Sequence, residues 1–159
     1  MLLNFESLAG HSRIWIYQSN RKFYENELPT INEKLSSFLE TWNNNSSDFK
    51  TGFEIKYDRF IIVGVESNEN LTTALIDQLV STIISLQMEL EIELLDKLNV
   101  CFKQGKFISY KELIDFKKLI KGKAINAKTI VFNNLIETKS ELQDNWEIPL
   151  ADSWHNRFL

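Results

Sequence analysis

The sequence is poor in the residues that most often build metal and redox sites. It contains one cysteine, Cys101, so no disulfide bond can form within the chain, and this fits a reducing compartment. Its two histidines, His11 and His155, belong to no His-x-x-His motif, and no Cys-x-x-Cys motif exists. Because zinc sites in proteins depend on such spaced ligands, we expect neither a metal ion nor another cofactor.

Glycine and proline are also scarce, with five and two residues respectively. A phosphate-binding loop of the pattern G-x-x-x-x-G-K-[ST] needs two glycines five positions apart, because its backbone amides enclose the phosphate groups. No two glycines have this spacing, and neither Gly105-Lys106 nor Gly122-Lys123 continues with serine or threonine. The sequence therefore excludes an ATPase of this class. Since it shows no other catalytic signature, we expect a protein that is not an enzyme.

The chain also lacks a general excess of positive charge, its net charge being -4. Residues 1–100 hold 8 basic and 15 acidic side chains, whereas residues 101–128 hold 8 lysines and 2 acidic side chains. Domains that bind nucleic acid are usually basic as a whole, so the sequence argues against nucleic acid as a partner. No apolar run approaches the roughly 18 residues of a membrane span, and we expect a cytoplasmic protein without membrane contact.

A regular hydrophobic pattern is present, and it alternates between strand and helix periods. It predicts a strand over 13–20, a helix over 28–42, strands over 53–57 and 60–65 joined by a turn at Asp58-Arg59, and a helix over 70–90 capped by Asn70 or Thr72. A further strand is predicted near 92–94 or 100–103, and the segment "KQGK" at 103–106 predicts a turn into a second strand. The apolar run at 60–65 is typical of a central strand, and Gly64 within it indicates a bulge or a close contact. This order is typical of the α+β ferredoxin-like sandwich, an antiparallel sheet with both helices on one face.

The last third of the chain has a different pattern. It predicts a helix over 109–121, a strand over 129–132, a helix over about 137–144 and an aromatic tail over 151–159. We expect residues 1–100 to form the ferredoxin-like core and residues 101–159 to form a C-terminal extension that packs on it, both in one compact unit. In the tail, Trp154 and Phe158 are expected to anchor on the sheet. The polar segment 43–48 predicts a solvated loop.

Four segments distributed over the chain carry a family resemblance. They read "RIWIYQSNRKF", "EIKYDRFIIVGVE", "KTIVFNNLIETKSEL" and "WEIPLADSWHNRF", together with the overall length. From about residue 12 to its end, the chain resembles a small family of uncharacterised Bacteroidetes proteins that are often labelled "ABC transporter ATPase". The label conflicts with the missing phosphate-binding loop, and no Ser-Gly-Gly-Gln signature segment is present either. The resemblance therefore implies a family but no ATPase activity.

A fainter resemblance covers residues 109–132. Leu119, Ile120, Ile125, Thr129 and Val131 fall on the spacing of the GYF-like module, in which a turn containing glycine joins a helix to a strand. Gly122 stands one position early and Phe132 replaces a tryptophan. Because the diagnostic aromatic motif of peptide-binding GYF domains is missing, this resemblance implies a helix-turn-strand shape and no ligand.

The leading functional hypothesis is a non-enzymatic interaction or accessory domain that binds another protein or a second copy of itself. The chain has more aromatic side chains than one half-covered sheet face hides, so these are either covered by the C-terminal segment or exposed as a binding patch. The candidate contact residues are Trp15, Tyr17 and Trp154.

The alternative hypothesis is a small enzyme or small-ligand binder with a pocket between the sheet and the C-terminal part. Its candidate residues are Asp77, Arg59, His155 and Arg157. Such a site requires a histidine and a carboxylate to converge in one cavity. For Asp77, the simpler role is a favourable interaction with the N-terminal end of its helix.

Overall fold

The structure is a computed structural model that describes residues 1–42 and 49–159, so the predicted loop over 43–48 lies outside the described residues. The chain divides into two compact units, the first formed by residues 1–95 with 137–139 and the second by residues 96–136 with 140–159. Both contain an antiparallel sheet and α-helices, which confirms the predicted α+β class. That the C-terminal part packs on the core stays a prediction.

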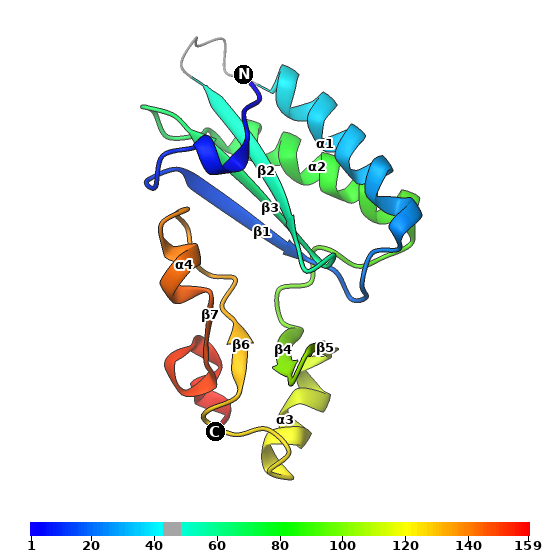
Figure 1. Cartoon of the computed structure of the whole chain (residues 1–159), viewed down its shortest axis with the longest axis vertical. Coiled ribbons are helices and arrows are strands. Elements are labelled where there is room, and N and C mark those ends of the chain that lie inside the picture. Colours follow the sequence, from blue (N-terminus) through cyan, green and yellow to red (C-terminus); the bar gives the residue numbers. More distant parts are fainter. Residues whose placement is uncertain (43–48) are drawn as a thin grey trace. The chain divides into compact units, whose positions relative to one another are not determined.

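The first unit contains the elements that the hydrophobic pattern predicts most clearly (Figure 1). They are β1 (Arg13–Gln18), α1 (Leu28–Thr41), β2 (Lys50–Lys56), β3 (Phe60–Glu66) and α2 (Thr73–Leu90), with short 3₁₀ helices at Phe5–Ser7 and Glu25–Glu27. Thr72 caps α2, since its side chain accepts a hydrogen bond from the Leu75 amide at 3.2 Å. The alternative cap, Asn70, lies outside the helix.

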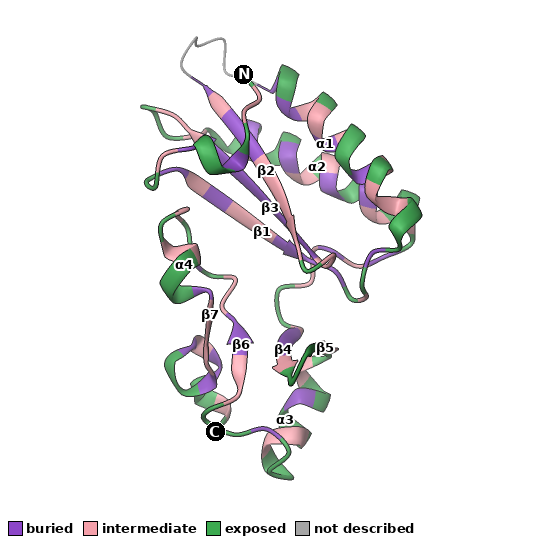
Figure 2. Cartoon of the chain, viewed as in Figure 1, coloured by how far each residue is buried: buried purple, intermediate pink, exposed green. Residues whose placement is uncertain are grey.

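The sheet of the first unit has the order β1-β3-β2 and is antiparallel throughout. The helices α1 and α2 lie side by side on one of its faces (Figure 1). Every residue of the central strand from Phe60 to Val65 is buried, as the apolar run predicts (Figure 2). Because β3 has a neighbour on each side, β1 and β2 are the two edge strands.

The core between the sheet and the helices is fully buried at its centre. Leu35 and Leu39 of α1 and Leu79 and Ile83 of α2 have no exposed surface, and Val63 of β3 faces them. Each such side chain contributes roughly 2 kcal/mol through the apolar surface removed from water. Trp42 closes this core at the end of α1, where its indole Nε1 donates to the Leu75 carbonyl at 3.1 Å.

The N-terminal segment lies along β2 and then crosses the sheet face opposite the helices. The Leu3 amide donates to the Thr51 carbonyl at 2.7 Å, and the Thr51 amide donates to the Met1 carbonyl at 2.9 Å, so the segment runs parallel to the start of β2. Beyond this point Phe5 and Leu8 lie against Gly64, where a side chain would clash. The close contact predicted at Gly64 is therefore confirmed.

The strand order does not confirm the ferredoxin-like arrangement. The segment predicted as its fourth strand forms β4 (Val100–Gln104), which pairs with other strands in the second sheet. The outer edge of β1 instead carries a short bridge to Thr138, with the Ile14 amide donating to the Glu137 carbonyl at 2.9 Å. The prediction of a helix over 137–144 is wrong for its first turn, because these residues are extended beside β1.

The second unit is built around a four-stranded sheet of order β5-β4-β6-β7. Its further elements are β5 (Phe107–Lys111), α3 (Leu113–Lys121), β6 (Ile130–Phe132), α4 (Glu141–Asn145) and β7 (Glu147–Pro149). Phe102, Phe116, Val131 and Leu150 form its small core. The predicted helix and strand over 109–132 are present, but α3 begins later than predicted, because residues 107–111 pair with β4.

Candidate functional site

Trp15 and Tyr17, two of the predicted contact residues, belong to the core of the first unit. Both project from β1 toward α1 and α2, where Trp15 meets Trp42 edge to face with ring centroids 6.2 Å apart. Tyr17 is buried, and this burial raises the pKa of its hydroxyl. The helices of the first unit cover these two side chains, so they do not form an exposed aromatic patch.

Arg59 and Asp77, proposed as parts of a pocket, have separate positions in the first unit. Arg59 lies at the turn between β2 and β3, and its Nη1 donates to the Ser19 carbonyl at 3.2 Å. Asp77 is exposed on α2. Within residues 1–42 and 49–95, no ion pair joins the two. Arg59 therefore stabilises the hairpin turn against the end of β1.

Trp154, His155 and Arg157 come together on the 3₁₀ helix Trp154–Phe158 of the second unit. The His155 ring is stacked on Trp154 at a centroid distance of 4.0 Å, and its Nδ1 lies 2.9 Å from the Ser153 hydroxyl oxygen. Burial, with a smaller contribution from the Arg157 charge, lowers the pKa of His155 to about 4. A histidine that is neutral, buried and held by the adjacent capping serine stabilises the C-terminal turn.

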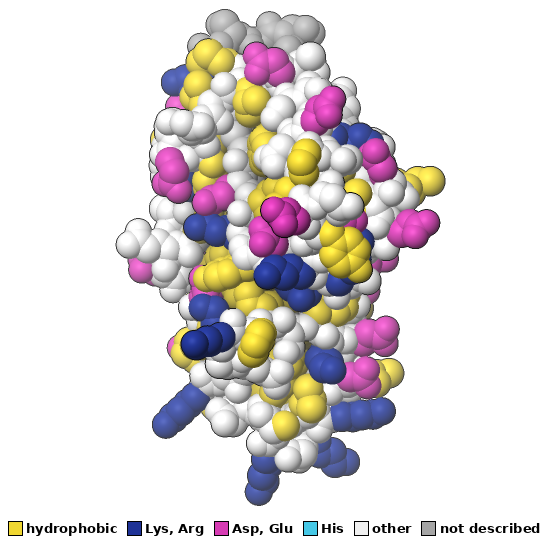
Figure 3. Space-filling view, turned by 45° about the vertical axis from the view of Figure 1, so that its right-hand side comes forward, with side chains coloured by type: hydrophobic (Ala, Val, Ile, Leu, Met, Phe, Trp, Pro, Cys, Tyr) yellow, Lys and Arg dark blue, Asp and Glu magenta, His cyan; other side chains and the backbone are white. Residues whose placement is uncertain are grey.

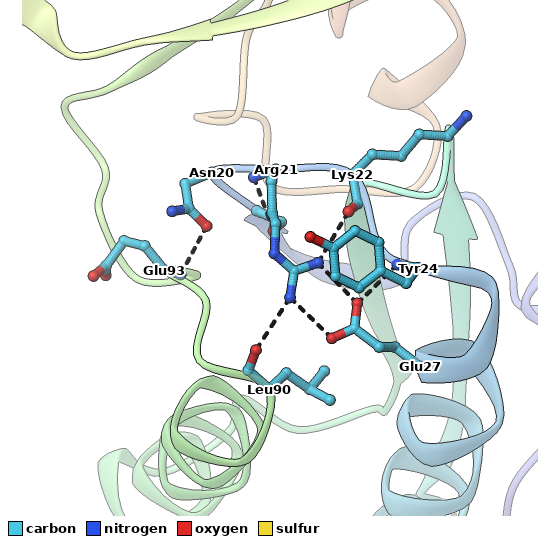
Figure 4. A network of polar contacts seen from close by, with 8 residues as sticks. Asn20, Arg21, Lys22, Tyr24, Glu27, Leu90 and Glu93 are labelled. Carbon is cyan, nitrogen blue, oxygen red and sulfur yellow. Dashed lines mark hydrogen bonds and ion pairs between the residues drawn. The ribbon is translucent and has the colours of Figure 1, made fainter.

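An extensive polar network in the first unit surrounds Arg21 (Figure 4). Its guanidinium donates to both carboxylate oxygens of Glu27, at 2.8 and 2.9 Å, and lies 4.1 Å from the Tyr24 ring centroid. It also donates to the Leu90 carbonyl at 3.1 Å, at the C-terminal end of α2, where a positive charge is favourable. The hydrogen bond from Arg21 is the main cause that lowers the pKa of Glu27.

This network joins the start of α1 to the end of α2, and sequence reasoning missed it. The only signal is a capping-box spacing, since the Tyr24 amide donates to the Glu27 carboxylate at 2.7 Å. Tyrosine is not a usual residue at that position, so the pattern does not stand out. Both Nη groups of Arg21 and both carboxylate oxygens of Glu27 have partners within the chain, which favours a structural role.

A groove of about 830 Å³ lies along β2 and has the volume of a ligand-binding site. Residues of the N-terminal segment between Leu2 and Ser7 line it, and α1 contributes Leu28, Asn32 and Ser36. Its remaining lining comes from Phe53, Glu54 and Ile55 of β2 and from Asp58 in the following turn. Figure 1 shows β2 between the N-terminal segment and α1.

The backbone of β2 presents unused hydrogen-bonding groups to this groove. In an antiparallel pair, successive residues direct their amide and carbonyl groups alternately to one side and the other. Thr51 directs its groups away from β3, to the N-terminal segment, so Phe53 and Ile55 face the same way. No residue in the described part of the chain pairs with these groups. The second half of β2 is therefore an open strand edge.

The two faces of this open edge differ in chemistry. Phe53 and Ile55 lie on the helix side, where they are partly buried against the core. Glu54 points to the opposite face, where its carboxylate is 3.2 Å from the Lys56 ammonium group. The charged side chains that line the groove, Glu54 and Asp58, are both acidic.

Comparisons with known proteins give no family assignment. No protein-family model matches the chain, no curated protein matches it, and no solved structure matches it.

The described residues also contain neither a candidate metal site nor a helix that could span a membrane. No group of three or more histidine, cysteine, aspartate or glutamate side chains there is arranged to hold a metal ion. Over the same residues, no helix combines the length and apolar composition that crossing a membrane requires. The candidate site is the β2 groove.

Proposed function

We propose that the protein is a non-enzymatic interaction module whose first unit binds an extended segment of another protein along the open edge of β2. The observation that carries the proposal is the pair of backbone positions, Phe53 and Ile55, that face the groove without partners among the described residues. Peptides that add a strand to a sheet edge obtain affinity from such main-chain groups, and specificity from the side-chain pockets beside them.

Main-chain hydrogen bonds alone would not give a stable complex, so binding requires both these bonds and side-chain contacts. Two outward-facing residues offer four backbone groups, and each hydrogen bond contributes only about 1 kcal/mol net. A micromolar complex needs about 8 kcal/mol, in addition to the free energy lost when two molecules associate. The remaining affinity has to come from apolar side chains of the peptide that are buried beside Leu28, Phe53 and Ile55.

Three further expectations accompany this proposal. The buried thiol of Cys101 supports a cytoplasmic location. The order β1-β3-β2 with two helices on one face supports a ferredoxin-like arrangement that lacks its last strand. The resemblance to the Bacteroidetes family stays a proposal on sequence grounds.

Selection from a library of random nine-residue peptides, displayed on phage, tests the function with the full chain as bait. We expect the selected peptides to shift the amide NMR signals of Phe53 and Ile55 and to protect both amides from hydrogen exchange. Failure to enrich any peptide, or binding that leaves these two amides unchanged, would contradict the proposal.

A pair of variants at one position sharpens the test. Ile55→Pro removes the outward amide but leaves the hydrogen bonds between β2 and β3 in place, because the Ile55 amide faces the groove. Ile55→Val keeps the amide and a similar apolar shape. We expect Ile55→Pro to weaken peptide binding at least tenfold and Ile55→Val to change it little. Equal binding by both variants would exclude strand addition at this edge.

A further inference from the structure

The side-chain pattern of a bound strand follows from the geometry of β2. Side chains of neighbouring strands that stand opposite each other project to the same face of the sheet. Peptide residues opposite Phe53 and Ile55 would therefore project to the helix side, and the residue between them would project to the side of Glu54. This alternation is the same whether the peptide runs parallel or antiparallel to β2.

The helix side of the groove favours apolar residues. Phe53 and Ile55 are only partly buried there, and Leu28 of α1 lines the same space. Two apolar peptide side chains, one on each side of the central residue, would remove this remaining apolar surface from water. Asn32 and Ser36 of α1 border the groove with neutral polar groups.

The opposite side favours a basic residue. Glu54 and Asp58 are the charged lining residues, and no lysine or arginine is among those that line the groove. The Glu54–Lys56 pair is partly exposed, with 26% and 44% of the two side chains accessible, so it neutralises Glu54 only weakly. The first unit as a whole holds 8 basic and 15 acidic side chains, which also attracts a positively charged segment.

The sequence of β2 itself argues against a second copy as the occupant. An antiparallel pair of two β2 edges that places Phe53 opposite Ile55 would also place Glu54 opposite Glu54 of the other copy. Like charges directly opposite each other destabilise a strand pair. Charged side chains on edge strands commonly prevent such self-association.

We propose that the β2 groove selects an extended segment of another protein with an apolar–basic–apolar triplet, its lysine or arginine beside Glu54 and its apolar residues beside Phe53 and Ile55. This inference rests on the proposed function and adds the class of partner. The second unit presents many lysine side chains to solvent (Figure 3).

Three synthetic peptides test the inference against the full chain. They have the sequence Thr-Thr-Val-X-Val-Thr-Thr with blocked ends, where X is lysine, glutamine or glutamate. Titrations followed by NMR should rank them lysine, glutamine, glutamate, with at least a tenfold difference between the first and the last. The difference should shrink as the salt concentration rises, because exposed charges are screened.

Variants that remove a single negative charge identify the residue that interacts with the central residue of the peptide. Glu54→Gln should lower the preference for lysine over glutamate by about fivefold, which corresponds to roughly 1 kcal/mol. Glu33→Gln on the exposed surface of α1 removes the same charge outside the groove and should leave the preference unchanged.

The outcomes separate the two proposals. If all three peptides shift Phe53 and Ile55 with equal affinity, the inference is wrong and the proposed function stands. If none binds and the display selection also fails, both are wrong. A concentration-dependent dimer that shifts the same amides would assign the edge to a second copy and overturn the choice of a different protein.

Discussion

Gly52 of β2 stands directly opposite Gly64 of β3, and the N-terminal segment lies against both. A Cβ atom at Gly52 would lie 3.0 Å from the Leu3 carbonyl oxygen and 3.1 Å from the Cα atom of Phe5. These are backbone atoms, which cannot rotate away as the end of a side chain can. The glycine pair therefore allows the segment that lines the β2 groove to approach the sheet.

Gly52→Ala is accordingly expected to lower the free energy of unfolding by about 2 kcal/mol, because the N-terminal segment has to shift. Chemical denaturation measures this loss, and hydrogen exchange of residues 2–8 locates it. Gly64→Ala is the matched comparison, since its nearest neighbours are the side-chain ends of Leu8 and Phe5. An alanine at Gly52 that leaves both stability and exchange unchanged would contradict this account of the segment.

Lys139 is expected to fix the same N-terminal segment at Glu6 and Leu8. Its ammonium group donates to the Glu6 carbonyl at 2.9 Å and to the Leu8 carbonyl at 2.6 Å. Lys139→Met keeps the apolar stem but removes both hydrogen bonds, and should cost about 2 kcal/mol. Limited proteolysis should then cleave the first twelve residues faster than in the Lys22→Met control, which alters an exposed lysine. Equal cleavage rates would show that Lys139 does not clamp the segment.

The Arg21–Glu27 pair should contribute to stability in a pH-dependent way. Glu27→Gln is expected to lower the free energy of unfolding by about 1.5 kcal/mol at pH 7, because it breaks a bidentate, charge-assisted contact. The pKa of Glu27 is lowered in the folded state, so this contribution is complete above its ordinary value of 4.5 and is lost as the pH falls through the folded pKa. Urea denaturation at pH 7 and pH 3 measures the change.

The control for this pair is Glu25→Gln, which removes a neighbouring exposed carboxylate. It should alter stability by less than about 0.5 kcal/mol. A difference between wild-type protein and Glu27→Gln that persists undiminished at pH 3 would show that the charge of Glu27 is not the cause.

His155 should make the second unit sensitive to mild acid. Its folded pKa of about 4 lies below its ordinary value of 6.5, so the unfolded chain binds the proton first as the pH falls. Stability should therefore be unaffected above pH 6.5 and should decrease between pH 6.5 and pH 4, by about 3 kcal/mol in total. Hydrogen exchange of β6 and α3 as a function of pH would record this loss.

His155→Asn removes the titrating group and should flatten this pH dependence, although the variant starts from a lower stability. His11→Asn, which removes an exposed histidine, serves as the control. If wild-type protein and His155→Asn lose stability in parallel from pH 6.5 to pH 4, the buried imidazole is not responsible.

Local patterns predicted much of the first unit. The helical spacing of Leu35 and Leu39, and of Leu79 and Ile83, places apolar side chains on one stripe, which is sufficient to identify both helices. The pattern failed at residues 137–139, which are extended beside β1. There the tertiary pairing with Ile14 outweighs a weak helical preference.

The candidate site was far less predictable, because none of its features is a motif. The alternation of Phe53, Glu54 and Ile55 is visible in the sequence and indicates a strand with two unlike faces. Nothing in that alternation shows whether the strand has one neighbour or two. The predicted site residues were chosen by side-chain chemistry, whereas the groove is defined mainly by backbone groups.

Residues a few positions apart were enough to predict most helices and strands of the first unit, the apolar face of each, and the absence of a phosphate-binding loop. Which strands pair with one another could be seen only in the tertiary structure. Val100–Gln104 joins the second sheet instead of β1, and no described residue forms hydrogen bonds with the outer backbone groups in the second half of β2. The backbone groups of different strand edges are alike, so the local sequence does not show which strands pair. For this reason the open edge at Phe53 and Ile55 can be recognised only from the assembled sheet.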